Sequence, residues 1–218
     1  MSERWEAPPR GLVVAVLLLT LVVLGLGGAV LAVRLRPAGP PRTAVERDLA
    51  AWRQAVAAAP RDDQARTGLG LALLEAGRTA EARRAFEEAL ELNPENWVAL
   101  FQLGLLEADR DPERAVRLLD RAAHFAPRSS KAGPLVAEGD LLMEMDDPEG
   151  ARSAYRRAIA DVPFLFDAHL GLARALEALG DPERALREYR EAARFDPTDE
   201  EVREAIARLE AGGASPGP

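Results

Sequence analysis

The chain has 218 residues, a formal net charge of −8 and no cysteine. The absence of cysteine excludes disulfide bonds, thiolate metal sites and a cysteine nucleophile. Residues 1–36 carry four arginines against two glutamates, or +2, so the residues after them sum to −10. Such an acidic remainder argues against nucleic acid as the main partner.

The first predicted element is a membrane-spanning helix. The stretch from Leu12 to Val33 contains no charged residue. At about 1.5 Å per residue it reaches roughly 33 Å, which is enough to cross a hydrocarbon core of about 30 Å. We therefore expect a short N-terminal tail at residues 1–10 and a transmembrane helix, acting as a signal anchor, at residues 11–33. The alternative is a cleaved signal peptide, whose apolar core would be shorter, at about 7–15 residues.

Small residues share one face of this predicted helix. They recur at i, i+3, i+4 and i+7, as Gly25, Gly28, Ala29 and Ala32. Because small side chains let transmembrane helices pack closely, we expect the span to form a homodimer or to meet a partner helix. The other interpretation is that Gly and Ala are simply common in such spans.

The arginines that flank the span indicate its orientation. Two precede it, and five follow it within about 20 residues, namely Arg34, Arg36, Arg42, Arg47 and Arg53. This bias favours a single-pass protein of the cell membrane whose larger part lies in the cytoplasm, although large domains can cross a membrane regardless of charge.

After a Pro-rich linker at residues 34–42, one spacing recurs four times. Each copy has a small residue, an aromatic residue or Leu four positions later, Ala three positions after that, and then Pro. The predicted core positions are Ala82, Phe86, Ala89, Ala115, Leu119, Ala122, Ala151, Tyr155, Ala158, Ala185, Tyr189 and Ala192. The prolines lie 33 to 36 residues apart, and a period near 34 is typical of stacked helix pairs.

Each unit is expected to hold two helices. The repeated small, bulky and Ala positions form one face of the second helix. The first helix carries a small residue where a larger side chain would push the two helices apart. These small residues are Gly70, Gly104, Gly139 and Ala173. The predicted N-caps of the second helices are Thr79, Asp111, Asp147 and Asp181, the last three each followed by Pro and Glu.

This pattern resembles the tetratricopeptide repeat family over residues 63–199, about two-thirds of the chain. The resemblance implies an all-α fold, a right-handed helical solenoid that follows the transmembrane helix. The expected parts are a partial repeat helix at residues 43–62, four repeats at 63–96, 97–129, 132–165 and 166–199, a capping helix at 200–211 and a disordered tail at 212–218.

In this family the first helix of each unit lines a concave groove. The positions that the resemblance places there are Leu71, Leu74, Glu75, Phe101, Gln102, Leu105, Asp109, Val136, Asp140, Met143, Glu144, Asp167, Leu170, Arg174 and Glu177. They are apolar toward the N-terminal half and mostly acidic toward the C-terminal half. Because apolar area supplies affinity while charge selects the partner, we expect a client peptide or helix that is amphipathic and net basic.

Nothing in the sequence indicates catalysis. His124 and His169 have no partners at ligand spacing, so we expect no metal, no cofactor and no enzymatic activity. The layout resembles membrane-anchored tetratricopeptide proteins of bacteria, such as those of cytochrome c maturation and those associated with the translocon. It implies a membrane-tethered adaptor or scaffold in protein assembly or biogenesis at the membrane. The alternative is a structural subunit that docks side-on in a larger membrane complex.

Overall fold

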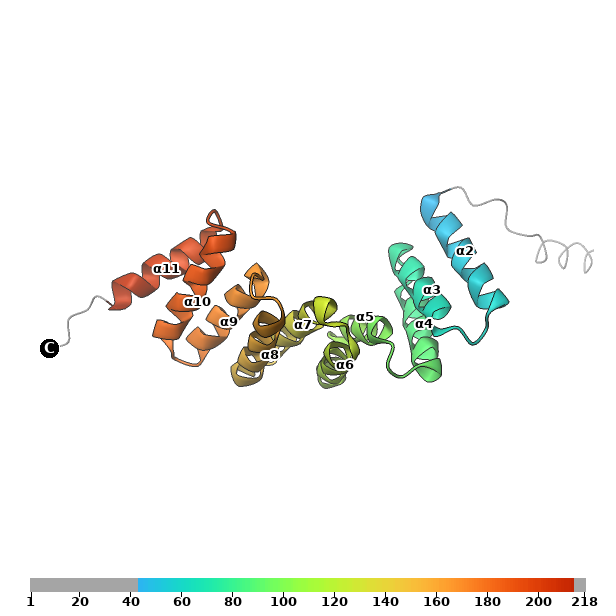
Figure 1. Ribbon diagram of the computed structural model, residues 1–218, viewed down its shortest axis with the longest axis horizontal. Helices are drawn as coiled ribbons and strands as arrows, with labels where there is room; N and C mark the ends of the chain where they lie inside the picture. The colour runs from blue at the N-terminus through green and yellow to red at the C-terminus, as the bar shows by residue number, and fades with distance from the viewer. Residues whose placement is uncertain (1–42, 214–218) are drawn as a thin grey trace, which may run out of the picture. The chain divides into compact units, whose positions relative to one another are not determined.

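The structure, a computed structural model, describes residues 43–213. This part holds ten α-helices and one 3₁₀ helix (Figure 1): α2 (Ala44–Ala58), α3 (Asp63–Glu75), α4 (Thr79–Leu92), α5 (Trp97–Glu107), α6 (Pro112–Phe125), η1 (Arg128–Ser130), α7 (Ala132–Glu144), α8 (Pro148–Asp161), α9 (Phe166–Ala178), α10 (Pro182–Phe195) and α11 (Glu200–Gly213). The predicted transmembrane helix with its small-residue face, and the Pro-rich linker, lie outside the described residues. None of the described helices combines the length and the hydropathy that a membrane span needs.

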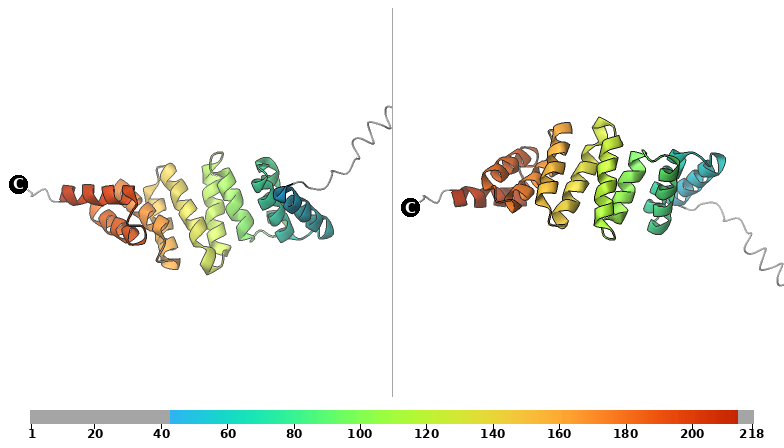
Figure 2. Two further views of the ribbon diagram at one scale, coloured as in Figure 1. Left: turned by 90° about the horizontal axis from the view of Figure 1, so that it is seen from above. Right: turned by 90° about the horizontal axis from the view of Figure 1, so that it is seen from below.

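The helices pack in pairs along the chain (Figure 2). Each first helix contacts the second helix that follows it: α3 with α4, α5 with α6, α7 with α8 and α9 with α10. Each second helix also contacts the first helix of the next pair, while α2 packs on α3 and α11 on α10. The prediction of an all-α solenoid of helix pairs is therefore confirmed for the described residues.

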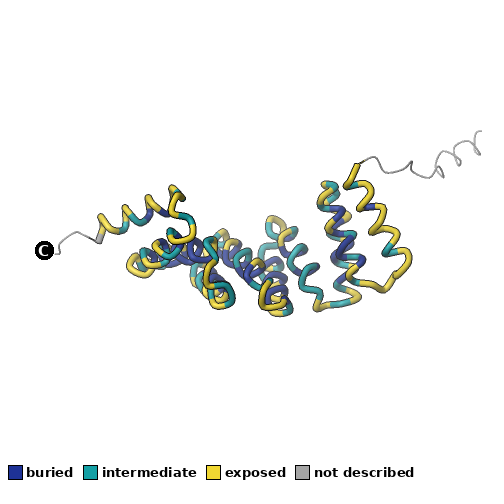
Figure 3. The backbone as a smooth tube through the Cα atoms, turned by 45° about the horizontal axis from the view of Figure 1, so that its top comes forward, coloured by how far each residue is buried: buried dark blue, intermediate teal, exposed yellow. Residues whose placement is uncertain are grey.

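The interior of the array is built from the repeated positions of the second helices. All twelve predicted core residues are buried. The four bulky ones, Phe86, Leu119, Tyr155 and Tyr189, are among the largest side chains that lie almost wholly inside. Figure 3 shows the buried positions running through the helix pairs, while exposed residues mark the turns. The repeat therefore supplies one large side chain to the interior of each pair.

Glycines on the first helices make room for these side chains. A Cβ atom built on Gly70 would lie 2.5 Å from the ring of Phe86, and one on Gly139 would lie 2.6 Å from the ring of Tyr155. Tyr155 is also closed in by the next pair, because a Cβ on Gly171 would come within 2.4 Å of the same ring. Such contacts are far inside van der Waals distance, so only glycine lets these helices approach the rings this closely.

The N-caps of three second helices follow the prediction. The carboxylates of Asp111, Asp147 and Asp181 each accept a hydrogen bond from the backbone N–H three residues on. The prediction of Thr79 as a cap was wrong, because Thr79 is already the first residue of α4 and the N-cap is Arg78. Arg78 directly follows the turn at Gly77 and lies four positions before Ala82, the same spacing that the other caps keep from their small residues.

That turn contains a residue in the left-handed region. Gly77 has φ +70° and Gly180 has φ +73°, and each directly precedes the N-cap of the next helix. Asp146 occupies the corresponding position after α7 with φ +59°. Glycine adopts this conformation at no steric cost, whereas an aspartate does not. The third unit is therefore strained at a position where the first and fourth are relaxed.

The last helix closes the array. Val202 and Ala205 are buried, and Ile206 and Leu209 pack against the same core cluster. The ion pairs Arg174–Glu201 and Arg208–Glu177 tie α11 to α9. The apolar face predicted for the capping helix thus rests on the last pair.

Two carboxylates are buried between helices. Glu107 of α5 pairs with Arg83 of α4 and lies 3.7 Å from Arg114 of α6. Glu138 of α7 lies 3.4 Å from Arg157 of α8, yet burial raises its pKa to about 7. The Glu107–Arg83 ion pair is thus enclosed between the helices, whereas Glu138 is a carboxyl group whose pKa lies in the neutral range.

Candidate functional site

The first helices present most of the predicted groove residues at the surface. Fourteen of the fifteen are exposed or half-buried. The exception corrects the prediction: Leu170 lies in the core cluster that contains Tyr155 and Tyr189, because α9 contacts α7, α8 and α10. The remaining positions form a row along α3, α5, α7, α9 and the turn after α5. Some of its side chains are partly buried against the core clusters, namely Leu74, Phe101, Val136 and Met143.

This row changes character along the chain. The residue that follows the small position of each first helix is exposed in all four units, as Leu71, Leu105, Asp140 and Arg174. Leu71 is 40% exposed and Leu105 is 45% exposed. The N-terminal half therefore offers apolar surface, and the C-terminal half offers charge.

Much of that charge is already engaged. Asp140 accepts a hydrogen bond of 2.6 Å from the Tyr155 hydroxyl. Glu177 accepts one of 2.7 Å from the Tyr189 hydroxyl, and its ion pair with Arg208 holds its pKa below the ordinary value. The carboxylates of Glu75, Asp109, Glu144 and Asp167 make no ion pair or hydrogen bond with the described residues. These four are the acidic groups that a ligand could meet.

A hollow of about 480 Å³ lies at the apolar end of the row, where α2, α3 and α5 meet. Its apolar lining includes Trp52, Leu71, Trp97 and Val98, and its polar lining includes Asp63, Asn93 and Asn96. Trp52 is 40% exposed, like Leu71. A volume of this size with aromatic walls and a few placed polar groups is typical of a ligand pocket.

The apolar wall depends on a glycine. A Cβ atom on Gly68 would lie 2.6 Å from the ring of Trp52. The indole therefore lies directly against the backbone of α3, beside Leu71. The sequence places Trp52 within the expected partial repeat helix at residues 43–62, but neither Trp52 nor Trp97 was predicted as a site residue. The available signal was that two of the three tryptophans of the chain lie at the start of the repeat array.

The polar wall is a closed hydrogen-bond network. The side-chain amide of Asn96 donates to Asp63 at 2.7 Å and to the Thr67 hydroxyl at 2.9 Å. Asn93 donates to the same carboxylate oxygen of Asp63 at 3.0 Å. Asn96 also caps α5 by accepting from the N–H of Ala99. Because Asp63, Thr67, Asn93 and Asn96 bond to one another, this part of the wall is held in one shape beside the apolar wall.

No cluster of three metal-binding side chains lies within residues 43–213. His169 is bonded to the Glu188 carboxylate at 2.8 Å, and this bond raises its pKa. His124 is exposed and meets the edge of Phe125. Both ring nitrogens of His169 are engaged, because Nε2 lies 3.1 Å from the Pro163 carbonyl oxygen. The absence of enzymatic activity, metal and cofactor stays a prediction.

Comparison with known proteins identifies the repeated unit. Residues 64–96 and residues 136–200 each match a family model described as a tetratricopeptide repeat. These two segments are tetratricopeptide repeats. They include α3 and α4 and most of the last two pairs, so the resemblance inferred from the spacing is confirmed there. The membrane-anchored bacterial type stays a prediction.

A relative in sequence is anaphase-promoting complex subunit 3 of Schizosaccharomyces pombe, 28% identical over 145 residues. That match covers 66% of this chain and 22% of the relative, so the chain spans less than a quarter of the relative's length.

Several solved structures share the fold. YrrB, described as a tetratricopeptide repeat protein with an unusual peptide-binding site, has a TM-score of 0.66 at 16% identity, covering 75% of this chain and 84% of that one. MamA has a TM-score of 0.60 at 20% identity, and the match covers 73% of this chain and 89% of that one. PilF of Pseudomonas aeruginosa has a TM-score of 0.64 at 16% identity, and the match covers 80% of this chain and 86% of that one. The described part thus shares the fold of these tetratricopeptide-repeat structures.

Proposed function

We propose that the chain is an adaptor that holds a peptide or short helix of a client protein against its first helices. The observation that carries this proposal is the hollow where exposed Trp52 and Leu71 stand beside a satisfied polar network. Exposed apolar surface in a preformed hollow favours the burial of an apolar side chain of a ligand. A fold shared with YrrB, which has a peptide-binding site, supports the same use.

The unpaired acidic groups define the charge of the client. Glu75, Asp109 and Glu144 lie along the same row, beyond the apolar hollow. Charge of one sign along a binding surface selects partners of the other sign and speeds their association. The client segment is therefore amphipathic and net basic, with its apolar residue in the hollow.

Peptide binding to the purified whole chain tests this proposal. A peptide array of net-basic and net-acidic amphipathic sequences is probed with the parent chain and with Leu71→Asp. Loss of one half-exposed leucine contact, together with the new charge, should weaken binding about tenfold or more. The matched control is Leu92→Asp on α4, because Leu92 is 39% exposed but does not line the hollow. Absence of binding to the net-basic peptides, or equal effects of the two substitutions on that binding, would overturn the proposal.

We further propose that residues 11–33 tether this adaptor to the cell membrane as a single-pass helix, with the repeats in the cytoplasm. The support is the uncharged apolar stretch and the excess of arginines after it. A role in protein assembly or biogenesis at the membrane fits such a tether. The chain should stay with membranes in alkaline carbonate, and protease added to intact cells should leave the repeats uncut. Release by carbonate would refute the tether, and cleavage in intact cells would reverse the orientation.

A further inference from the structure

A second cleft lies between the second helices of the last two units. It has a volume of about 460 Å³, and α9 forms its floor with Leu172 and Leu176. Four arginines line its walls: Arg152 and Arg156 from α8, and Arg184 and Arg187 from α10. The carboxylate among the lining residues is Glu188, which is bonded to His169. The cleft is thus strongly basic in a part of the chain whose net charge is acidic.

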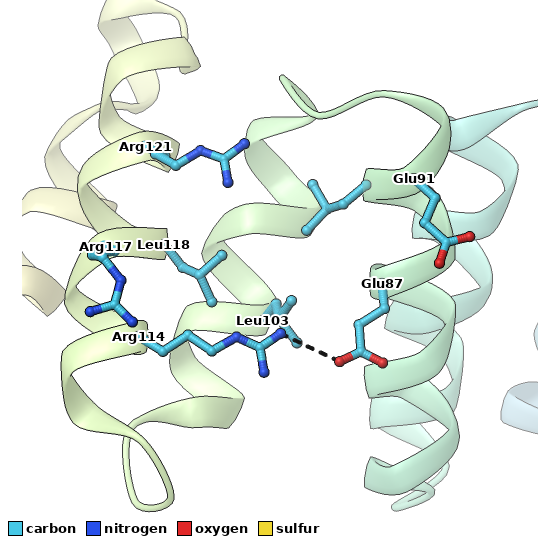
Figure 4. A pocket seen from close by; sticks show the side chains of 8 residues that line it. Glu87, Glu91, Leu103, Arg114, Arg117, Leu118 and Arg121 are labelled. Atoms are coloured by element: carbon cyan, nitrogen blue, oxygen red, sulfur yellow. Dashed lines mark ion pairs between the residues drawn. The ribbon is translucent and has the colours of Figure 1, made fainter.

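The corresponding cleft between α4 and α6 is lined by three arginines and two glutamates, and the chain itself forms an ion pair across it. There the Glu87 carboxylate lies 3.5 Å from the Arg114 guanidinium on the facing helix, as Figure 4 shows. Arg83, on the same wall, is paired with Glu107 from the floor helix α5. Between α6 and α8, Asp120 pairs with Arg157 across the gap at 2.9 Å. In each of these two clefts, a carboxylate of one unit forms an ion pair with an arginine of the next unit.

The repeat spacing shows what replaces these carboxylates in the cleft between α8 and α10. Glu87 and Asp120 lie five positions after Ala82 and Ala115, and the residue five positions after Ala151 is Arg156. Glu107 lies four positions after Leu103, and the residue four positions after Leu172 is Leu176. Arg184, at the position of Arg114, therefore faces an arginine-bearing wall in place of a carboxylate-bearing one. The cleft between α8 and α10 therefore lacks the equivalents of both Glu87 and Glu107.

The arginines of this cleft have little else to pair with. Arg152, Arg156 and Arg187 make no ion pair or hydrogen bond with the described residues, and Arg184 pairs with Asp181, the N-cap of its own helix, at 3.3 Å. Like charges that face each other across a narrow gap destabilise it, and guanidinium groups bind carboxylates in a bidentate manner. An external anion would relieve this repulsion.

We propose that this cleft binds an acidic peptide segment of a partner protein. The arginines stand one turn apart in two rows, at i and i+4 on α8 and at i and i+3 on α10. Two rows match a chain that places carboxylates on both sides along its length, whereas one phosphate would reach only part of them. A long nucleic acid would extend beyond the cleft over the acidic remainder of the chain, which repels it, whereas a short acidic segment stays within the cleft. This site lies on the second helices and is independent of the hollow at Trp52.

Fluorescence anisotropy with the whole chain tests the proposal. The probes are a fluorescein-labelled Glu-rich peptide and the same peptide with Gln in place of every Glu. The parent chain should bind only the Glu-rich peptide. Arg156→Glu should weaken that binding at least tenfold, because it restores the carboxylate that Glu87 supplies in the cleft between α4 and α6. The matched control is Arg203→Glu, which reverses an exposed arginine of α11 outside the cleft and should leave binding unchanged.

Arg156→Glu should also raise the melting temperature, because it replaces repulsion with an ion pair; the variant therefore remains folded. Equal binding of the two peptides, equal effects of the two variants, or tighter binding of inorganic phosphate or of phosphatidylglycerol vesicles through Arg156 would overturn the proposal. Leu71→Asp leaves this binding intact, so failure here and failure of the client groove are distinguishable.

Discussion

Gly171→Ala should destabilise the array although it removes a helix-interior glycine. A methyl group at this position would lie 2.4 Å from the ring of Tyr155. The ring cannot move away, because the backbone at Gly139 closes its other side with a corresponding approach of 2.6 Å. Overpacking of this kind costs about 1–3 kcal/mol. The better helix propensity of alanine offsets about 1 kcal/mol of that cost.

Because the contact is so short, the cost lies near the upper end of that range, and the net loss of about 2 kcal/mol should lower Tm by about 4–8 °C for a chain of this size. Thermal unfolding followed by circular dichroism measures it. In a Tyr155→Leu background, which copies Leu119 of the second unit, the same substitution should be neutral or stabilising. Gly212→Ala is the control, since no atom lies within 4 Å of the added methyl group. A Gly171→Ala chain that melts no lower than its parent, or an equal loss in both backgrounds, would refute the packing argument.

Three further substitutions test other features of the fold. Asp146→Gly should raise the stability by about 1 kcal/mol in denaturant unfolding, because it relieves a positive φ; an unchanged midpoint would contradict this. The raised pKa of Glu138, about 7 against an ordinary 4.5, means that its contribution is complete below pH 4.5 and is lost as the pH rises through 7. The free energy of unfolding should therefore fall less steeply between pH 4.5 and 7 in Glu138→Gln than in the parent, by at most about 3 kcal/mol. An unaltered pH profile of stability would show that the carboxyl titrates normally. Arg83→Ala should cost about 3–5 kcal/mol, because it leaves Glu107 buried without its main partner; a loss below about 1 kcal/mol would contradict an enclosed pair.

The repeat core could be predicted from the sequence because spacing alone determines it. Positions such as Phe86 and Tyr155 recur with a helical period, and a helical period puts them on one face. The glycines opposite them followed from the same register. The cap at Thr79 was misplaced by one residue, because it rested on a favourable residue type rather than on the repeat register, which places the cap four positions before Ala82, at Arg78.

The contacts between units could not be predicted in this way. The hollow requires Trp52 and Trp97, 45 residues apart, to meet over the same helix. The bond from the Tyr155 hydroxyl to Asp140 joins a predicted core residue to a predicted groove residue, and it depends on how far the ring reaches through its pair. Pairwise distances between helices decide such contacts, and a single sequence carries no direct record of them.

The central claim is that the hollow on the first helices is where a client binds. Its most direct test is photo-crosslinking in the cells that make the chain, with a photoreactive residue at Leu71 or, for comparison, at Arg84 on the exposed side of α4. The account predicts a polypeptide adduct from position 71 that disappears when Trp97→Ala alters the hollow, and no such adduct from position 84. An adduct from position 84 alone, or one from position 71 that is indifferent to Trp97→Ala, would contradict it and favour a subunit that docks through its outer helices.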